Sequence, residues 1–137
     1  MSQNTYRLTL KSTHQESERI PDYISELQPK AELSDDETSN LMLLVSEAVT
    51  NAIEHGNMLD PDKKAELTIE VLADKITVTV TDEGEGFDPD ELTENPINED
   101  NLLNVRGRGV FILRELTDEL TFPDDGRTTR FVIHRQN

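Results

Sequence analysis

The fold is decided by residues 43–57, which read LLVSEAVTNAIEHGN. The stretch predicts a helix in which Glu47, Asn51 and His55 recur every four residues. A step of four residues turns about 400° around an α-helix, so these side chains form one stripe. The apolar residues of the stretch fill the neighbouring arc, which places the stripe at the rim of the buried face. Polar groups at the edge of a core are costly unless they bind something, so we expect a ligand there.

This stripe has a chemical interpretation and a purely structural one. Asn51 offers a neutral oxygen, which suits a Mg²⁺ ion that takes its other ligands from phosphate and water. Glu47, one turn earlier, is placed to accept a proton from an attacking hydroxyl. The structural alternative is a helix with a polar edge, in which His55 only helps Gly56 to end the helix.

The composition predicts one acidic domain. The chain has 137 residues, enough for a hydrophobic core, and we expect a single domain over residues 1–137. It has no cysteine, which excludes disulfides and cysteine chemistry and fits a reducing compartment. The net charge of −16, from 29 acidic and 13 basic residues, argues against a nucleic-acid partner. No apolar run is long enough to span a membrane, so we expect a cytoplasmic protein.

Apolar periodicity predicts an alternation of strands and helices along the chain. Ser34 and Glu37 form a capping-box pattern at the start of the long helix, Pro29 is expected to end the helix before it, and Gly56 to end the long helix itself. Strands outnumber crossovers, which predicts an α+β fold: a two-layer α/β sandwich whose mostly antiparallel mixed sheet is covered on one face by helices. We expect strands at 6–11, 67–72, 76–82, 117–122 and 128–135, and helices at 16–28, 34–55 and from 107 onward.

A carboxylate is expected on the core side of one of these strands. Ile76, Val78 and Val80 share the apolar face of their strand, and the period of two puts Asp82 on the same face. The sequence EGEGF follows at residues 83–87. A carboxylate at a strand end can accept a hydrogen bond from the exocyclic amine of adenine, and glycines let backbone approach a flat base. The alternative is an ordinary Asp-Gly turn, but the position of Asp82 on the apolar face of its strand counts against this alternative.

A third motif, RGRGVFI, occupies residues 106–112. Its glycines lead into an apolar helix, and the free N–H groups at a helix N-terminus attract anions. The two Arg place positive charge there in an otherwise acidic chain. The motif is no dinucleotide fingerprint, because no strand precedes it, and it lacks the Gly-Lys-Ser/Thr ending of a P-loop.

In this order and spacing the three motifs resemble the N box and the two glycine boxes of the histidine-kinase-like (GHKL) ATP-binding superfamily. Gyrase, the ninety-kilodalton chaperones, histidine kinases and mismatch-repair ATPases share these boxes. The sequence is most similar to the anti-sigma factor serine/threonine kinases: VSEAVTNAI at 45–53 with His55-Gly56 resembles their N box, and RGRGVFI resembles their second glycine box. The resemblance covers nearly the whole chain.

This resemblance implies a role for each matching residue around the nucleotide. Glu47 would be the general base of a kinase, and Asn51 would coordinate Mg²⁺. Asp82 would hold the adenine of ATP, and Gly84 and Gly86 would shape the base pocket.

The resemblance also implies how the phosphates are held. Residues 95–106 would form an ATP lid. Thr128 would correspond to the family's threonine near the adenine, although Arg127 separates it from Gly126 where the family usually has Gly-Thr. The residues implied to bind the phosphates are Arg106, Gly107, Arg108, Gly109, Val110 and Phe111.

The function implied is that of an anti-sigma regulatory factor. Such a protein binds Mg-ATP, phosphorylates a Ser or Thr of an anti-sigma antagonist and sequesters a sigma factor, as a homodimer. Arg19 is the nearest match to the family's partner-contacting Arg. The alternative is a nucleotide-gated protein-binding regulator without kinase activity, which would need no base at Glu47. A detached histidine-kinase catalytic domain is less favoured, because no helical segment with a phospho-accepting histidine precedes the domain in this sequence. His14 lies near the start of the sequence without such a helix.

Overall fold

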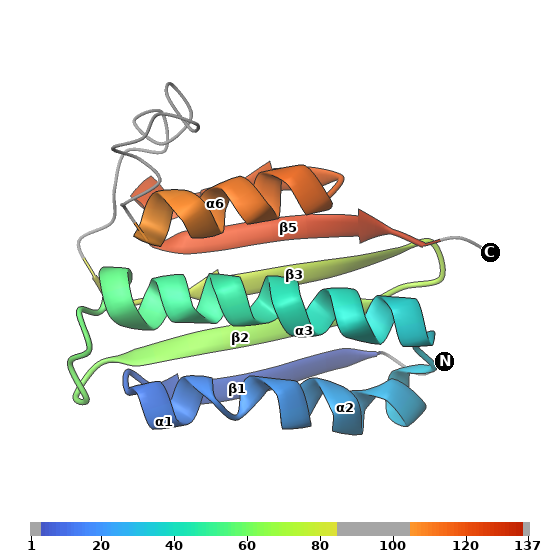
Figure 1. Ribbon diagram of the computed structural model, residues 1–137, viewed down its shortest axis with the longest axis horizontal. Helices are drawn as coiled ribbons and strands as arrows, with labels where there is room; N and C mark the ends of the chain where they lie inside the picture. Colours follow the sequence, from blue (N-terminus) through green and yellow to red (C-terminus); the bar gives the residue numbers. More distant parts are fainter. Residues whose placement is uncertain (1–3, 85–104, 136–137) are drawn as a thin grey trace.

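The computed structural model describes residues 4–84 and 105–135. Figure 1 shows two layers, a sheet and a set of helices that all lie on one of its faces. The predicted α+β sandwich is therefore confirmed. The elements, in order, are β1 (Thr5–Lys11), α1 (His14–Ser17), α2 (Ile20–Ala31), α3 (Asp35–Thr50), η1 (Asn51–Gly56), β2 (Lys64–Val71), β3 (Lys75–Thr81), α6 (Val105–Leu116), β4 (Glu119–Thr121), η2 (Asp124–Gly126) and β5 (Thr128–His134).

The described strands form one sheet in the order β1-β2-β3-β5-β4, and each of these pairings is antiparallel. The chain leaves β3, reaches the sheet edge at β4 and returns along β5 between the two. This return sets the end of β3 beside the start of β5, with Thr81 opposite Thr128. The residues that follow β3 and precede β5 consequently meet at the same end of the sheet.

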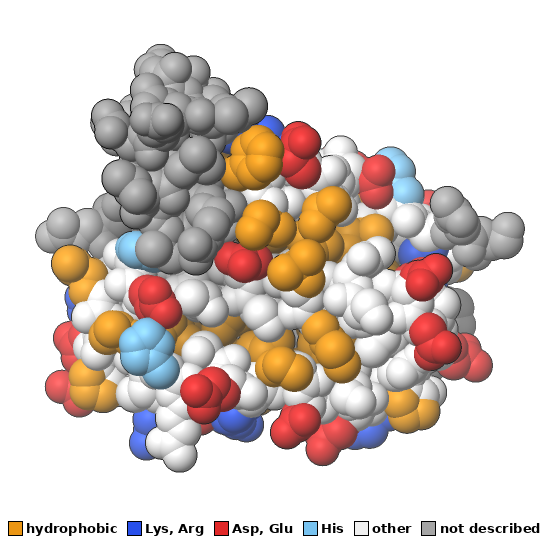
Figure 2. Space-filling model, in the orientation of Figure 1, with side chains coloured by type: hydrophobic (Ala, Val, Ile, Leu, Met, Phe, Trp, Pro, Cys, Tyr) orange, Lys and Arg blue, Asp and Glu red, His pale blue; other side chains and the backbone are white. Residues whose placement is uncertain are grey.

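The hydrophobic core lies between the sheet and the helices. Strand β2 shows the expected period of two, because Ala65, Leu67, Ile69 and Val71 are buried while Glu66 and Glu70 are exposed. Full burial of each large apolar side chain contributes about 1.5–3 kcal/mol. Acidic side chains are spread over the helix-covered surface with few basic ones between them (Figure 2). None of the helices in residues 4–84 and 105–135 is long and apolar enough to span a bilayer.

The expectation that Pro29 ends a helix is wrong. Helix α2 contains Pro29 and continues to Ala31, while residues 14–17 form the separate helix α1. A proline inside a helix removes one backbone hydrogen bond and crowds the carbonyl four residues earlier. Here that cost falls near the end of the helix, where buried Leu27 and Ala31 hold it against the core. The helix ends at Ala31, and the left-handed backbone of Glu32 (φ 54°) turns the chain so that the Leu33 N–H also bonds to the Gln28 carbonyl (3.0 Å).

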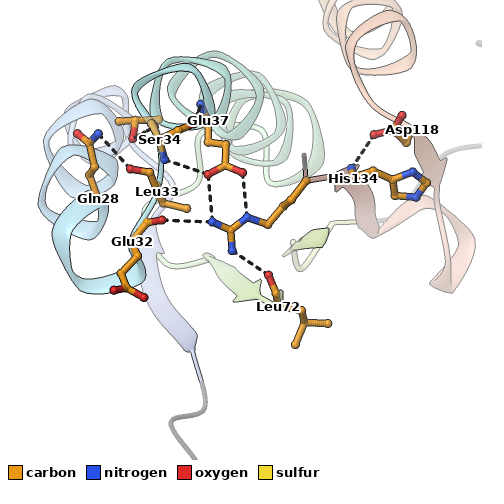
Figure 3. A network of polar contacts seen from close by, with 10 residues as sticks. Gln28, Glu32, Leu33, Ser34, Glu37, Leu72, Asp118 and His134 are labelled. Atoms are coloured by element: carbon orange, nitrogen blue, oxygen red, sulfur yellow. Dashed lines mark hydrogen bonds and ion pairs between the residues drawn. The ribbon is translucent and has the colours of Figure 1, made fainter. Parts of the chain in front are cut away.

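The start of α3 matches its capping box and adds an ion pair that the sequence did not predict. The Glu37 N–H donates to Ser34 Oγ (3.0 Å), and the Ser34 N–H donates to Glu37 Oε1 (2.9 Å). Arg135, just after β5, reaches the same carboxylate with Nε 2.9 Å from Oε2, and also donates to the carbonyls of Leu72 and Glu32. Figure 3 shows this junction, where the α2–α3 connection, the β2–β3 hairpin and the end of β5 meet.

This pair makes stability depend on acid. The Arg135 guanidinium, helped by the Ser34 N–H, lowers the pKa of Glu37 below its ordinary value of 4.5, although partial burial opposes the shift. A pKa that is lower in the folded state adds stability above the unfolded-state pKa, and that stability is lost as the pH falls through the folded-state pKa. The Glu37 contribution is therefore complete at neutral pH.

Glu37→Gln is expected to lower the free energy of unfolding by about 1–2 kcal/mol at neutral pH, since the pair is charge-assisted but partly screened by water. Urea unfolding from neutral pH down to about pH 3 should show the difference from wild type shrinking below about pH 4.5. Asp36→Asn, which removes an exposed charge from the same helical turn, is the control and should change stability by less than about 0.5 kcal/mol. A wild-type difference that stays constant with pH would contradict the ion-pair explanation.

Candidate functional site

The predicted polar stripe lies where α3 changes into a π-helix. Glu47 is in the last turn of α3, and Asn51 begins η1, whose wider turn closes with the Asn57 N–H on the Ala52 carbonyl at 2.8 Å. Sequence periodicity predicted one continuous α-helix to His55, and this part of the prediction is wrong. A π-turn holds more residues than an α-turn, so half-buried His55 follows Asn51 at another angle than the stripe assumed. Short π segments occur frequently at functional sites.

Asn51 carries a buried acceptor that no group in the described part of the chain satisfies. The residue is 5% exposed, and among residues 4–84 and 105–135 no donor bonds its Oδ1. Leaving such an oxygen unpaired costs about 1–3 kcal/mol, so a ligand at this point would recover it. The same ranges contain no group of three Asp, Glu or His side chains placed to hold a metal. A cation here would therefore rely on Asn51 together with oxygens of a nucleotide and water, which is how Mg²⁺ is commonly held.

Glu47 lies beside the second turn of α6, at Gly109. A Cβ atom added at Gly109 would lie 3.2 Å from Glu47 Oε2, which places the carboxylate against the backbone of that helix. Burial of Val110 and Leu113 packs α6 onto α3 and fixes this approach. Residues from the first and third sequence motifs thus lie together, and the half-buried Glu47 carboxylate sits between two helices.

Helix α6 begins at Val105, two residues before the predicted start. In an α-helix the N–H groups without an intrahelical acceptor are those of the first four residues, here Val105 to Arg108. Arg106, Gly107 and Arg108 belong to this first turn, whereas Gly109, Val110 and half-buried Phe111 lie deeper in the helix. The first turn is the part of α6 suited to an anion.

Asp82 is buried, as its strand parity predicted. The residue is 7% exposed, and it follows directly on β3. The Asp82 N–H donates to the Arg127 carbonyl (2.8 Å), and Asp82 Oδ1 accepts the Gly84 N–H (2.8 Å). These bonds fix a tight turn with a carboxylate at the end of the sheet, which is the arrangement that an amine-bearing base could recognise.

Gly56 closes against this turn and does not end the helix in the predicted way. A Cβ atom at Gly56 would overlap the Asp82 carboxylate, and one at Gly84 would overlap the Gly56 carbonyl group. The chain reverses only at Met58 and Leu59, which take left-handed φ values of 53° and 59°. Gly56 is therefore required for close approach of η1 to the Asp82 turn, a reason that lies outside the local sequence.

Arg127 is a site residue that the sequence reasoning did not assign. Its Nε donates to the Gly84 carbonyl at 2.9 Å, so Arg127 bonds the Asp82 turn from both its backbone and its side chain. The sequence did contain a signal for Arg127, because this residue separates Gly126 from Thr128 where the family usually has Gly-Thr. Thr128 itself is buried with its hydroxyl 3.1 Å from that of Thr81, at the start of β5.

The remaining predicted positions are placed only in part. Gly86 and residues 95–104 of the predicted lid lie outside the described residues, and of Arg106 and Arg108 the structure describes the helical backbone. Arg19, matched to a partner-contacting Arg, caps α2 and pairs with Glu16 at 3.1 Å.

The chain belongs to the histidine kinase-like ATPase domain family, whose model matches residues 11–133. This membership confirms the resemblance drawn from the motifs, and the family description implies ATP as the nucleotide.

Within this family the chain is similar to the serine-protein kinases RsbW. It is 32% identical to that of Bacillus subtilis over 90 residues, which are 62% of this chain and 56% of the relative. It is 30% identical over 110 residues to that of Staphylococcus epidermidis (76% and 69%). It is 29% identical over 124 residues to that of Listeria monocytogenes (82% and 78%). The match thus spans little more than half the length of the Bacillus protein.

Proposed function

We propose that this chain binds Mg-ATP, transfers the γ-phosphoryl group to a Ser or Thr of an anti-sigma antagonist protein, and sequesters a sigma factor as a homodimer. The observation that carries the proposal is the pairing of Glu47 with Asn51. The Glu47 carboxylate lies beside the second turn of α6, and one helical turn further along is a buried amide oxygen that has no donor among the described residues. The similarity to proteins named serine-protein kinases supports the same reading.

Each residue would have a separate task. Asn51 Oδ1 would hold Mg²⁺, which when bound neutralises charge on the phosphates. The first-turn N–H groups of α6 would bind phosphate oxygens, and the Asp82 carboxylate would accept a hydrogen bond from the adenine amine. Glu47 would accept the proton of the attacking hydroxyl. Phosphoryl transfer needs positioning and a proton acceptor more than covalent chemistry, and these side chains supply both.

Asn51→Ala is expected to weaken Mg-ATP binding about 10- to 100-fold, because a ligand to the metal is lost. Calorimetric titration of ATP, with and without Mg²⁺, measures this change. Asn40→Ala on the exposed side of α3 is the matched control and should bind like wild type. Equal affinity in Asn51→Ala and wild type would refute the metal assignment.

Transfer is tested with radiolabelled ATP and an anti-sigma antagonist protein, which would be sought among the neighbouring genes. Label on a Ser or Thr of the antagonist supports the kinase. If ATP binds while no label moves, the chain is a nucleotide-gated binder instead.

A further inference from the structure

A buried polar hub lies directly behind the Asp82 turn. Asn57, the residue after Gly56, has no exposed surface, and its side chain bonds three other segments. Its Oδ1 accepts the Glu83 N–H (2.7 Å), and its Nδ2 donates to Ser12 Oγ (2.7 Å) and to the Lys64 carbonyl (3.0 Å). The amide therefore joins the ends of β1, η1 and β3 to the start of β2.

The bond to Glu83 has a different consequence from the other two. Glu83 stands between Asp82 and Gly84, so its N–H belongs to the peptide that carries the Asp82 carboxylate into the site. Asn57 is also covalently joined to Gly56, which closes on that carboxylate. Through one side chain the end of η1 thus sets the orientation of the Asp82–Glu83 peptide.

The opposite side of the turn is held by Arg127, through its carbonyl on the Asp82 N–H and its Nε on the Gly84 carbonyl. With both sides bonded, rotation of the turn is restricted. Removing the Asn57 oxygen would leave one side free, and the Asp82 carboxylate could then swing away from its position beside Gly56.

We propose that Asn57 is a positioning residue for recognition of the purine base, acting through the Glu83 N–H on the Asp82 carboxylate. The inference rests on the proposed function, in which Asp82 accepts a hydrogen bond from the 6-amine of adenine. A fixed carboxylate rejects a 6-keto purine, because two acceptors would face each other without a proton between them. Asn57 therefore contributes to selectivity for ATP over ITP, which carries the keto group at this position.

The test compares the affinities of ATP and ITP in Asn57→Ala and Ser12→Ala, at a temperature where circular dichroism shows each variant folded. Ser12→Ala removes one hub partner, with its bond to the Lys63 carbonyl, and leaves the bond from Glu83 to Asn57 in place. Both variants are expected to melt below wild type. Only Asn57→Ala is expected to bind ATP about tenfold more weakly and to lose most of the preference over ITP.

Asn57→Asp keeps an oxygen for the Glu83 N–H while it loses the amide donors. It is expected to be less stable than wild type but to retain the ATP preference. If Asn57→Ala does not fold, Asn57→Asp is the test variant, and loss of its ATP preference overturns the inference. A wild-type ATP-to-ITP ratio in Asn57→Ala overturns the inference, as does an equal loss of preference in Ser12→Ala. If wild type itself binds no ATP, or does not prefer it to ITP, the proposed nucleotide site fails, and wild type alone reveals this.

Discussion

Glu47→Gln is expected to slow phosphoryl transfer about 10²- to 10⁴-fold while leaving the affinity for ATP nearly unchanged, because an amide cannot accept the proton of the attacking hydroxyl. Gln has the shape of Glu, so the contact of this side chain with the backbone at Gly109 is retained. The loss should consequently appear in the rate of transfer at saturating ATP, with little change in the ATP concentration needed for half-saturation.

Label transfer to the antagonist and calorimetry on the same protein sample separate these two quantities. Glu54→Gln is the matched control, since Glu54 lies on the neighbouring η1 and pairs with His14 at 3.4 Å. It should transfer label at close to the wild-type rate. Transfer by Glu47→Gln at the wild-type rate would remove Glu47 from the catalytic role.

Gly56→Ala is expected to lower stability by about 1–3 kcal/mol and to weaken ATP binding about a hundredfold. The new methyl group would overlap the Asp82 carboxylate, and the Gly56 carbonyl is already packed against Gly84, so the turn has to move. Urea unfolding and calorimetry measure the two effects.

Gly109→Ala provides the comparison for stability. Among the described residues its added Cβ would meet the end of the Glu47 side chain, at 3.2 Å, which can shift, and alanine favours a helix over glycine. Its free energy of unfolding should be equal to that of wild type or higher. If Gly56→Ala is as stable as wild type and binds ATP equally well, then the close approach of η1 to Asp82 has no role in the site.

Much of the fold follows from patterns that are local in the sequence. The capping box at Ser34 and Glu37 depends on residues three apart, and it forms as predicted. The burial of Asp82 follows from the period of a single strand, and it is confirmed because β3 continues regularly to Thr81. In both places tertiary contacts agree with the local rule, the capping box in one case and the strand period in the other.

What could not be predicted depends on residues far apart in the chain. The pair of Glu37 and Arg135 joins the start of α3 to the residue after β5, 98 positions later, and no local pattern predicts it. Gly56 matches the pattern of a helix stop, yet its requirement comes from Asp82 on another element. Pro29 shows the opposite case, since burial of its neighbours overrides a local signal to stop.

The position of β5 in the sheet determines when the proposed nucleotide site can form during synthesis. β5 is the last described strand, yet it lies between β3 and β4. Arg127, which holds the Asp82 turn, immediately precedes it. A nascent chain that ends before this point has the predicted base Glu47 and the predicted metal ligand Asn51, but the predicted base pocket is incomplete. Because such long-range pairing forms late, we expect ATP binding to distinguish nascent chains that contain β5 from shorter ones.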